Sequence, residues 1–313
     1  MPEPDMIVAL TPNLSLDRTM TLDRFLAPGQ LHRVTGLTVA AGGKGVNLAR
    51  AVRAFGGQGC VAGVVSGFNG QHFRALLEAE GLDNVLEDGE GETRECQAFL
   101  SDEGHPTEIN EAGPPYQPEA VARLLPRLPQ GQVVVCGSLA PNTPGTAFLE
   151  MLRGLDRPVV DSSGAGLEAA VQAGASLIKP NEHELEALTG SGTLDSAREL
   201  YGRSGVQILL TRGERGAAFI GEEVWEVEAP QIEVKNPVGS GDTLLGTFLY
   251  ARQGGQSIPD ALRLAVAAGS ANAMLGGPLK FRVEVARELM AQTRLLTPAE
   301  PECHSVGPER RFP

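Results

Sequence analysis

The segment best suited to chemistry is PVGSGD at residues 237–242, which runs directly into an apolar, helix-like stretch at 243–251. Two glycines around a serine leave successive main-chain N–H groups open at a helix N-terminus, where anions bind. Asp242 stands beside these donors as a proton acceptor. This arrangement is suited to phosphoryl transfer, because the amides can hold negative charge while the neighbouring carboxylate takes the proton of an alcohol. Alternatively, Asp242 only caps the helix and the glycines only turn the chain.

A second glycine cluster, GGKGVN at residues 42–47, also opens a predicted helix. Lys44 supplies a point charge for a phosphate, and Asn47 lies one turn further on, where its amide can bind a hydroxyl. The spacing differs from the Walker P-loop, which requires GxxxxGK[ST]. A flexible glycine turn with an exposed lysine explains the same residues equally well.

The third signal is KPNEHEL at residues 179–185. Asn181 and Glu184 are three positions apart and share one face of a short helix, so their oxygens could hold Mg²⁺ through water. The same two residues also fit a capping box, with Asn181 as the N-cap. The two interpretations are compatible, because a cap at a strand end still directs oxygens toward a crevice.

Short apolar runs alternate with segments of helical periodicity along most of the chain, and polar residues follow many of the runs. This pattern predicts a mostly parallel sheet covered on both faces, with the polar residues gathered at the edge where the strands end. Three consecutive helices are predicted near the end, at 242–252, 257–275 and 283–294. The predicted strands are 6–10, 59–65, 133–136, 158–160, 176–178, 206–210 and 217–220.

Two segments break this rhythm, at residues 16–38 and 93–110, and we expect them to form a small accessory β-layer. Residues 296–313 are polar and proline-rich, and we expect a tail there.

Composition narrows the classes of function. The net charge of −13 excludes generic nucleic-acid binding through bulk charge, and no apolar run approaches the ~18 residues of a membrane span. The acidic, proline-rich start is unlike a secretory signal. Four widely spaced cysteines, three of them in apolar settings, predict reduced core thiols and a cytoplasmic protein rather than a disulfide framework or zinc site. GQGCVA at 57–62 matches a dinucleotide fingerprint but precedes a strand, which is the wrong context.

Together and in this order, the motifs resemble those of the PfkB (ribokinase-like) carbohydrate kinases, in the branch of 1-phosphofructokinase and tagatose-6-phosphate kinase. The similarity runs from about residue 10 to residue 277. It implies a three-layer α/β/α fold in one domain spanning 1–313, with a mostly parallel central sheet and a β-sheet lid formed from roughly 12–38 and 92–111. The matching motifs are LTPNLSLD, GGKGVN, TEINEAGP, CGSLAP, DSSG, KPNEHEL, TRGERGA and PVGSGDTLLGTF.

The resemblance implies ATP-dependent phosphorylation of a sugar phosphate, assisted by Mg²⁺, and assigns roles by motif. Asp242 is expected to be the catalytic base, beside an anion hole made by the amides of Gly239, Ser240 and Gly241. The sugar phosphate is expected to contact Asp17, Gly43, Lys44, Asn47, Arg94 and Ser138. The nucleotide and its Mg²⁺ are expected to face Lys179, Asn181 and Glu184, with Asn181 and Glu184 meeting the metal through water. The rest of the nucleotide is expected against Thr211, Gly213 and Gly216, with Asn272 near the adenine end.

The resemblance favours fructose 1-phosphate as the acceptor, followed by tagatose 6-phosphate or fructose 6-phosphate. Two departures from the branch affect the sugar: Thr93-Arg94-Glu95-Cys96 lacks the asparagine of a TRxN pattern, and Ala140-Pro141-Asn142 replaces a Pro-Pro-Gly-like turn. The alternatives are a nucleotide-binding regulator without turnover and a nicotinamide dehydrogenase. We expect a homodimer formed through the lid and no nucleic-acid or membrane partner; dependence on a monovalent cation stays open.

Overall fold

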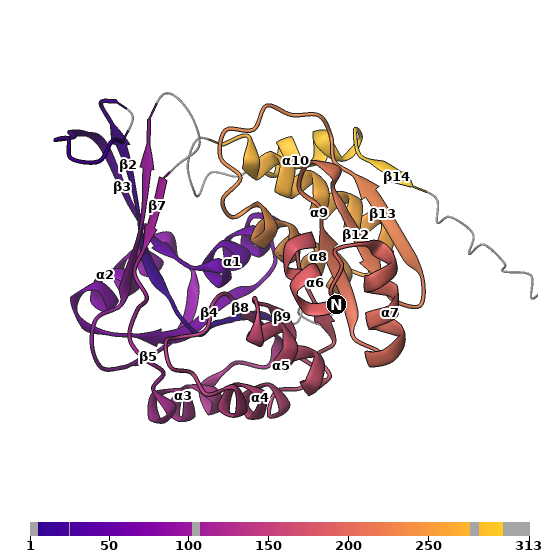
Figure 1. Ribbon diagram of the computed structural model, residues 1–313, viewed down its shortest axis with the longest axis horizontal. Coiled ribbons are helices and arrows are strands. Elements are labelled where there is room, and N and C mark those ends of the chain that lie inside the picture. Colours follow the sequence, from indigo (N-terminus) through magenta and orange to yellow (C-terminus); the bar gives the residue numbers. More distant parts are fainter. Residues whose placement is uncertain (1–5, 25, 102–106, 276–281, 297–313) are drawn as a thin grey trace, which may run out of the picture.

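The chain folds around two separate sheets in the computed structural model (Figure 1). Within the residues that the structure describes (6–24, 26–101, 107–275 and 282–296), ten strands form the large sheet in the order β14-β13-β12-β11-β10-β9-β8-β1-β4-β5. These strands are β1 (Met6–Thr11), β4 (Gly59–Val65), β5 (Asp83–Asp88), β8 (Gly131–Cys136), β9 (Val159–Asp161), β10 (Leu177–Ile178), β11 (Gln207–Thr211), β12 (Ala217–Ile220), β13 (Val224–Glu228) and β14 (Arg294–Leu296).

The strands from β5 to β11 are parallel, and β12, β13 and β14 extend the sheet antiparallel. The apolar runs at 59–65 and 217–220 coincide with β4 and β12. The predicted helix at 283–294 is wrong at its end. Helix α10 (Val283–Met290) stops earlier, because Arg294–Leu296 pairs with β13 as the edge strand β14.

Helices cover both faces of the large sheet (Figure 1). Side chains of β1 alternate between the two layers: Ile7 and Ala9 are buried with one set of helices and Val8 and Leu10 with the other. Both faces are covered, so the strands are continuously apolar rather than alternating with polar residues. The first layer holds α1 (Lys44–Ala54), α8 (Ser240–Gln253), α9 (Ile258–Ala273) and α10; the second holds α3 (Pro118–Leu124), α4 (Gly145–Arg153), α5 (Ala165–Ala173), α6 (Glu182–Thr189) and α7 (Leu194–Ser204).

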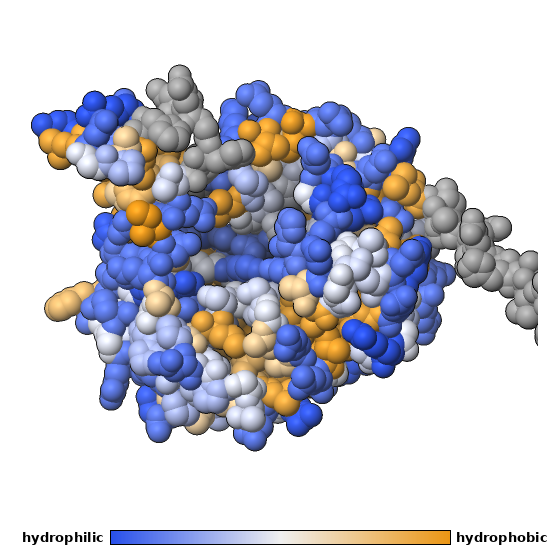
Figure 2. Space-filling view, in the orientation of Figure 1, coloured by the Kyte–Doolittle hydropathy of each residue, from blue (hydrophilic) through white to orange (hydrophobic). Residues whose placement is uncertain are grey.

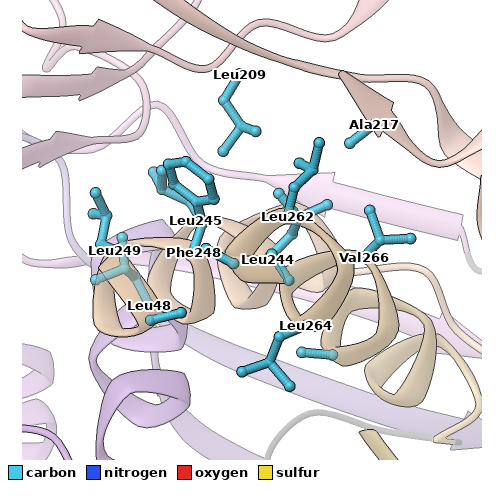
Figure 3. Packing of buried hydrophobic residues seen from close by; sticks show 14 of the residues in the cluster. Leu48, Leu209, Ala217, Leu244, Leu245, Phe248, Leu249, Leu262, Leu264 and Val266 are labelled. Atoms are coloured by element: carbon cyan, nitrogen blue, oxygen red, sulfur yellow. The ribbon is translucent and has the colours of Figure 1, made fainter. Parts of the chain in front are cut away.

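Helix α8 lies at the centre of the first layer. Figure 3 shows Leu245 and Phe248 packed with Leu209 of the sheet and with α9, and Leu48 of α1 on the other flank. Residues 242–249 of α8 are all buried. A helix that is buried all round is held rigidly by its neighbours. The N-terminus of α8, at the edge of the sheet, is therefore firmly positioned.

The small sheet has the order β3-β2-β6-β7 within the described residues and projects from one end of the molecule (Figure 1). It comprises β2 (Ser15–Leu22), β3 (Val34–Gly42), β6 (Arg94–Leu100) and β7 (Thr107–Asn110). The two irregular segments of the sequence do form this β-layer, and β3 continues four residues beyond the expected 38. Its base packs on α2 (Gly67–Glu80), where Leu16 and Ala41 contact the cluster around Phe73. The four residues of β7 are exposed.

Short 3₁₀ turns follow α3 at Leu125–Arg127 and β11 at Gly213–Arg215. The expected tail begins one residue too early, since Leu296 belongs to β14, and its remainder, residues 297–313, lies outside the described residues. Among the helices that the structure describes, none combines the length and the apolar character needed to cross a bilayer.

Candidate active site

A cleft of about 570 Å³ lies between the small sheet and the edge where the parallel strands of the large sheet end. Figure 2 shows the hollow, with hydrophilic residues on its floor. Its walls come from distant parts of the chain. Ten residues predicted for the site line it: Asp17, Gly43, Lys44, Asn47, Arg94, Ser138, Glu184, Gly239, Asp242 and Asn272. The strands, as expected, bring the polar ends of many segments into one crevice.

Asp242 lies in the first turn of α8 and is only 7% exposed. Its Oδ2 accepts a hydrogen bond of 2.9 Å from Nδ2 of Asn47, so Asn47 contacts the carboxylate in addition to lining the cleft. Burial and then the negative charge of Asp161 raise the pKa of Asp242 to about 6, against the lowering effects of Lys44, Asn47 and Lys179. A carboxylate with a pKa close to neutrality is suited to accept and release a proton.

The turn before α8 is held in a left-handed conformation at Gly239, with φ 77°. A Cβ at this position would lie 3.2 Å from Nδ2 of Asn47, so a side chain would strain the turn and crowd the amide that binds Asp242. Asn272 fixes the turn from α9 by donating to the Val238 carbonyl at 2.9 Å and the Ser240 hydroxyl at 3.1 Å.

The Ser240 N–H donates to the Pro237 carbonyl at 3.1 Å, within the turn itself. The next amides, those of Gly241 and Asp242, belong to the first turn of α8, where N–H groups lack intrahelical acceptors. They also sit at the positive end of the helix dipole. Of the predicted Gly239-Ser240-Gly241 set, the Ser240 amide is thus occupied within the turn, and the Gly241 amide stands with that of Asp242 at the start of the helix.

Two lysines from separate motifs meet at Asp161, the last residue of β9. Nζ of Lys44 lies 2.9 Å from Oδ1 of Asp161, and Nζ of Lys179 lies 3.3 Å from Oδ2. Asp161 is 1% exposed and Lys179 4%. Burial alone would lower the pKa of Lys44, but the carboxylates of Asp161 and Asp242 raise it above its ordinary value, so the ammonium stays charged. A Cβ at Gly241 would stand 3.5 Å from Nζ of Lys179, which places this ammonium against the α8 turn.

On the small-sheet side, Asp17 of β2 accepts a hydrogen bond of 2.8 Å from the Ser15 hydroxyl. Burial raises the pKa of Asp17, and the Ser15 hydrogen bond and the positive charges of Arg50 and Arg94 oppose the rise. The carboxylate fits only because residue 42 is glycine: a Cβ there would lie 2.0 Å from Oδ1 of Asp17.

Arg94, at the start of β6, lines the cleft but also ties the small sheet to the main body. Its Nη2 donates to the Asn13 carbonyl at 3.0 Å, and its Nη1 donates to the Glu111 carbonyl at 3.3 Å. Asn13 follows β1 and Glu111 follows β7, so the guanidinium joins the segments that connect the two sheets.

Asn181 and Glu184 form the capping box that the sequence allowed. The Asn181 side chain accepts from the Glu184 N–H at 2.8 Å, and Oε2 of Glu184 accepts from the Asn181 N–H at 2.8 Å. Glu184 still lines the cleft, whereas Asn181 lies outside it. Mg²⁺ in phosphate-transfer sites keeps several waters and uses only one or two carboxylates besides the substrate phosphates. Glu184 can supply one such carboxylate, which fits a divalent ion held through water.

The remaining predicted nucleotide contacts lie beyond the lining of the cleft. Thr211 ends β11, bridges Asn181 through the backbone, and donates its hydroxyl hydrogen to the Pro180 carbonyl at 3.4 Å. Gly213 and Gly216 bound the tight 3₁₀ turn that follows. Ser240, Gly241 and Lys179 also stand just outside the lining residues, immediately behind the floor.

Sequence reasoning missed several residues of the site, of which two matter most for its chemistry. It treated Asp161 only as a polar residue after a strand, although the DSSG motif contains it and the structure places it between two lysines. It expected Cys96 to be a core thiol, and this is wrong: Cys96 is a half-buried free cysteine that lines the cleft. Cys60 and Cys136 are buried free thiols, as expected. Cys303 lies outside the described residues.

The model of the pfkB family of carbohydrate kinases matches residues 11–279. This range includes the small sheet, the large sheet apart from most of β1 and all of β14, and every residue that lines the cleft. The chain belongs to the pfkB family of carbohydrate kinases. This confirms the resemblance carried by the motifs, and with it an enzyme of the kinase class, for which ATP and a divalent metal are the general requirements.

Individual relatives of this kinase agree with the family. It is 30% identical to a 1-phosphofructokinase of Haloferax volcanii over 275 residues, 85% of this chain and 90% of the relative. It is 31% identical to a tagatose-6-phosphate kinase of Staphylococcus epidermidis over 288 residues, 86% of this chain and 92% of the relative. Its fold matches phosphofructokinase-2 from Escherichia coli, solved in complex with substrates and products, with a TM-score of 0.85 and 25% identity over 91% of this chain and 98% of that one.

Proposed function

We propose that this kinase transfers the γ-phosphoryl group of ATP to a free hydroxyl of a ketohexose monophosphate, with fructose 1-phosphate as the favoured acceptor and fructose 1,6-bisphosphate as the product. The observation that carries the proposal is the buried Asp242 carboxylate, with a pKa of about 6, directly beside the unpaired amides that begin α8. This pairing supplies a proton acceptor and an anion hole at one point of the cleft.

In the proposed reaction, the acceptor hydroxyl gives its proton to Asp242 while its oxygen forms a bond to the γ-phosphorus. The bond between the γ-phosphorus and the β,γ-bridging oxygen breaks, and ADP leaves with that electron pair. The amides of Gly241 and Asp242 hold the oxygens of the group in transfer, and Lys44 and Lys179 add positive charge. A bound Mg²⁺ would neutralise charge on the nucleotide phosphates; Glu184, backed by Asn181, would hold it through water.

The sugar phosphate is proposed to lie toward the small sheet. The residues proposed to contact it all line the cleft, and two of them, Asp17 and Arg94, belong to strands of the small sheet; the others are Gly43, Lys44, Asn47 and Ser138. The relatives named for fructose 1-phosphate chemistry and those named for tagatose 6-phosphate chemistry are almost equally similar, so tagatose 6-phosphate and then fructose 6-phosphate are the second and third candidates. The nucleotide is proposed to extend past Lys179 toward Thr211, Gly213 and Gly216, with Asn272 holding the turn between the two substrates.

We also propose that the small sheet acts as a lid and forms a homodimer. Three large apolar side chains on β3 and the loop before it are exposed: Leu31 at 74%, Val34 at 50% and Leu37 at 55%. Such a group favours association with a second copy of the sheet. Light scattering on Leu37→Asp should then show a monomer, while Phe68→Asp, at an 82% exposed position of α2, should leave the dimer intact. A wild-type monomer would refute the dimer.

The function is tested by ADP release with ATP and Mg²⁺ over a panel of fructose 1-phosphate, fructose 6-phosphate, tagatose 6-phosphate and unphosphorylated ketohexoses. We expect the highest kcat/KM with fructose 1-phosphate and negligible turnover with the free sugars. Activity that ranks another ketohexose monophosphate first would correct the substrate. ATP binding without ADP release on any acceptor would favour a nucleotide-binding regulator.

A further inference from the structure

We propose that Asp161 is a positioning residue of the phosphoryl-transfer site: its two carboxylate oxygens hold the ammonium groups of Lys44 and Lys179 at the turn that begins α8. The inference rests on the proposed function and adds to it a residue that touches neither substrate. It draws on three elements that are distant in sequence, namely the N-terminus of α1 and the ends of β9 and β10.

The Asp161 carboxylate binds two lysines at once. Lys44 binds Oδ1 of Asp161 at 2.9 Å and Lys179 approaches Oδ2 at 3.3 Å, so each oxygen serves one lysine. The Lys179 side chain is only 6% exposed, so water cannot replace Asp161 as the partner of its charge. The Lys44 side chain is 36% exposed and faces the cleft. A long lysine side chain has many rotamers, and an ion pair fixed at its tip removes that freedom before the substrate arrives.

The lysines also stand where charge develops. Nζ of Lys179 lies against Gly241, as the 3.5 Å approach of a Cβ at that position shows, and Lys44 interacts with Asp242. With Asp242 ionised, the two lysines and the two aspartates are neutral as a group. Once Asp242 has taken the acceptor's proton, the group carries one positive charge, facing the phosphoryl group in transfer. The cluster thus stabilises the transition state more than the ground state.

Several elements packed around Asp242 carry groups that could influence it. They are Lys44 on α1, Asp161 at the end of β9, Lys179 after β10, Cys136 on β8 and Glu184 on α6. Cys136 remains a neutral thiol because burial raises its pKa well above the ordinary value. Among the described groups acting on Asp242, Asp161 supplies the negative charge that opposes ionisation. Removing the Asp161 charge should therefore lower the pKa of Asp242.

Three variants separate positioning from stability. Asp161→Asn removes the charge and keeps the shape, and Asp161→Glu keeps the charge but displaces it by one methylene. The matched control is Ser162→Ala, which removes the neighbouring buried hydrogen bond of 2.9 Å to the Gly137 carbonyl and leaves both lysines paired. Each full-length protein is assayed for kcat and KM with both substrates, for kcat against pH from 5 to 8, and for thermal unfolding.

We expect kcat of Asp161→Asn to fall about 100-fold, with both KM values changed by less than about threefold, because misplaced charge costs transition-state stabilisation. The acid limb of its pH profile should move to lower pH. Asp161→Glu should lose about tenfold in kcat and keep the wild-type acid limb. Ser162→Ala should melt earlier but keep kcat and the acid limb within about twofold of wild type.

An unmoved acid limb in Asp161→Asn, or a loss of kcat that added Mg²⁺ restores, would overturn the inference, the latter by assigning Asp161 to the metal instead. If Asp161→Asn does not fold, the test rests on Asp161→Glu. A wild-type kcat in Asp161→Glu would then overturn the inference. The two proposals fail separately. An inactive wild-type protein would remove both, whereas an active wild type with normal Asp161 variants would remove only this one.

Discussion

The floor of the cleft and the small sheet differ in how their charged side chains are held. On the floor and directly behind it, Asp161, Lys179 and Asp242 are buried and bind one another or Asn47 directly. On the small sheet, β6 is half-buried and β7 exposed along its length. Charges paired in a dry, packed environment keep one geometry, while those on a solvated sheet can adjust.

This difference matches the two tasks that we propose for the enzyme, phosphoryl transfer and the choice of sugar. The groups proposed for phosphoryl transfer stand at the edge of the rigid sheet and at the start of helix α8, which is buried from Asp242 to Leu249, so small displacements would be costly there. The departures from the branch pattern at Glu95 and Cys96 lie on β6 of the small sheet, where Cys96 lines the cleft. We therefore propose that the floor specifies the reaction and that the small sheet contributes to the choice of sugar.

The largest expected effect concerns the floor. Asp242→Asn should lower kcat roughly a thousandfold, because a general base contributes about 10²–10⁴-fold. It should not lower the thermal midpoint at pH 7.5, since the raised pKa of about 6 means that the folded state disfavours the ionised carboxylate. ADP release and thermal unfolding measure the two effects. The control is Asp195→Asn on the surface of α7, which should keep normal turnover. A near-normal kcat in Asp242→Asn would show that Asp242 is not the catalytic base.

The rigidity of the floor is tested by two truncations. Leu48→Ala, under α8 in the core, should cost about 2–5 kcal/mol of unfolding free energy, because it leaves a cavity that packed helices cannot close. Ile109→Ala, on exposed β7, should cost less than about 0.5 kcal/mol. Urea unfolding gives both values. Equal losses would break the contrast between the two regions.

Arg94→Ala tests the role of the small sheet in substrate choice. We expect the KM for the sugar phosphate to rise about tenfold or more, with the KM for ATP within about twofold, because a charge-assisted contact is worth roughly 1.5–3 kcal/mol. Arg53→Ala, which removes another guanidinium bound to a backbone carbonyl but outside the cleft, is the control. Equal increases in both KM values would mean that Arg94 serves only to hold the connections between the sheets.

The pH dependence gives the smallest effect. The base must be ionised, so kcat should be half-maximal near the Asp242 pKa of about 6 and fall roughly tenfold for each pH unit below it. The contribution of Asp242 to the stability of the fold changes with pH in the opposite direction to kcat. The folded pKa lies above the ordinary value of 3.8, so the folded state binds the proton more tightly, and the contribution of Asp242 to stability falls as pH rises from 3.8 toward 6.

A sugar phosphate titrates in the same range, so the residual activity of Asp242→Asn is the control for the pH profile. It should lack the acid limb. A limb of wild-type shape in that variant would belong to the substrate rather than to the base.

The sequence predicted the buried strands well because their apolar runs are covered on both faces, as in β4 and β12. It missed β5, which carries Asp83, Asn84, Glu87 and Asp88 at the edge of the sheet and has no apolar run to detect. The strand β14 was also missed, since three residues after a helix show no period of their own and pair only because β13 is adjacent.

At the site, the motifs identified which residues gather but not which of them bind one another. Local spacing gave the capping box of Asn181 and Glu184, because both partners lie within one turn. The contacts of Asp161 with Lys44, 117 residues away, and of Asn272 with Ser240 depend on the order of strands and the packing of α8 on α9. No pattern of neighbouring residues encodes them.

The most direct test of the account is a crystal structure of the kinase with a non-hydrolysable ATP analogue, Mg²⁺ and fructose 1-phosphate. We predict that oxygens of the terminal phosphate lie within hydrogen-bond distance, about 3 Å, of the Gly241 and Asp242 amides, with the acceptor hydroxyl at a similar distance from the Asp242 carboxylate. A terminal phosphate bound elsewhere in the cleft, away from the start of α8, would contradict the proposed mechanism.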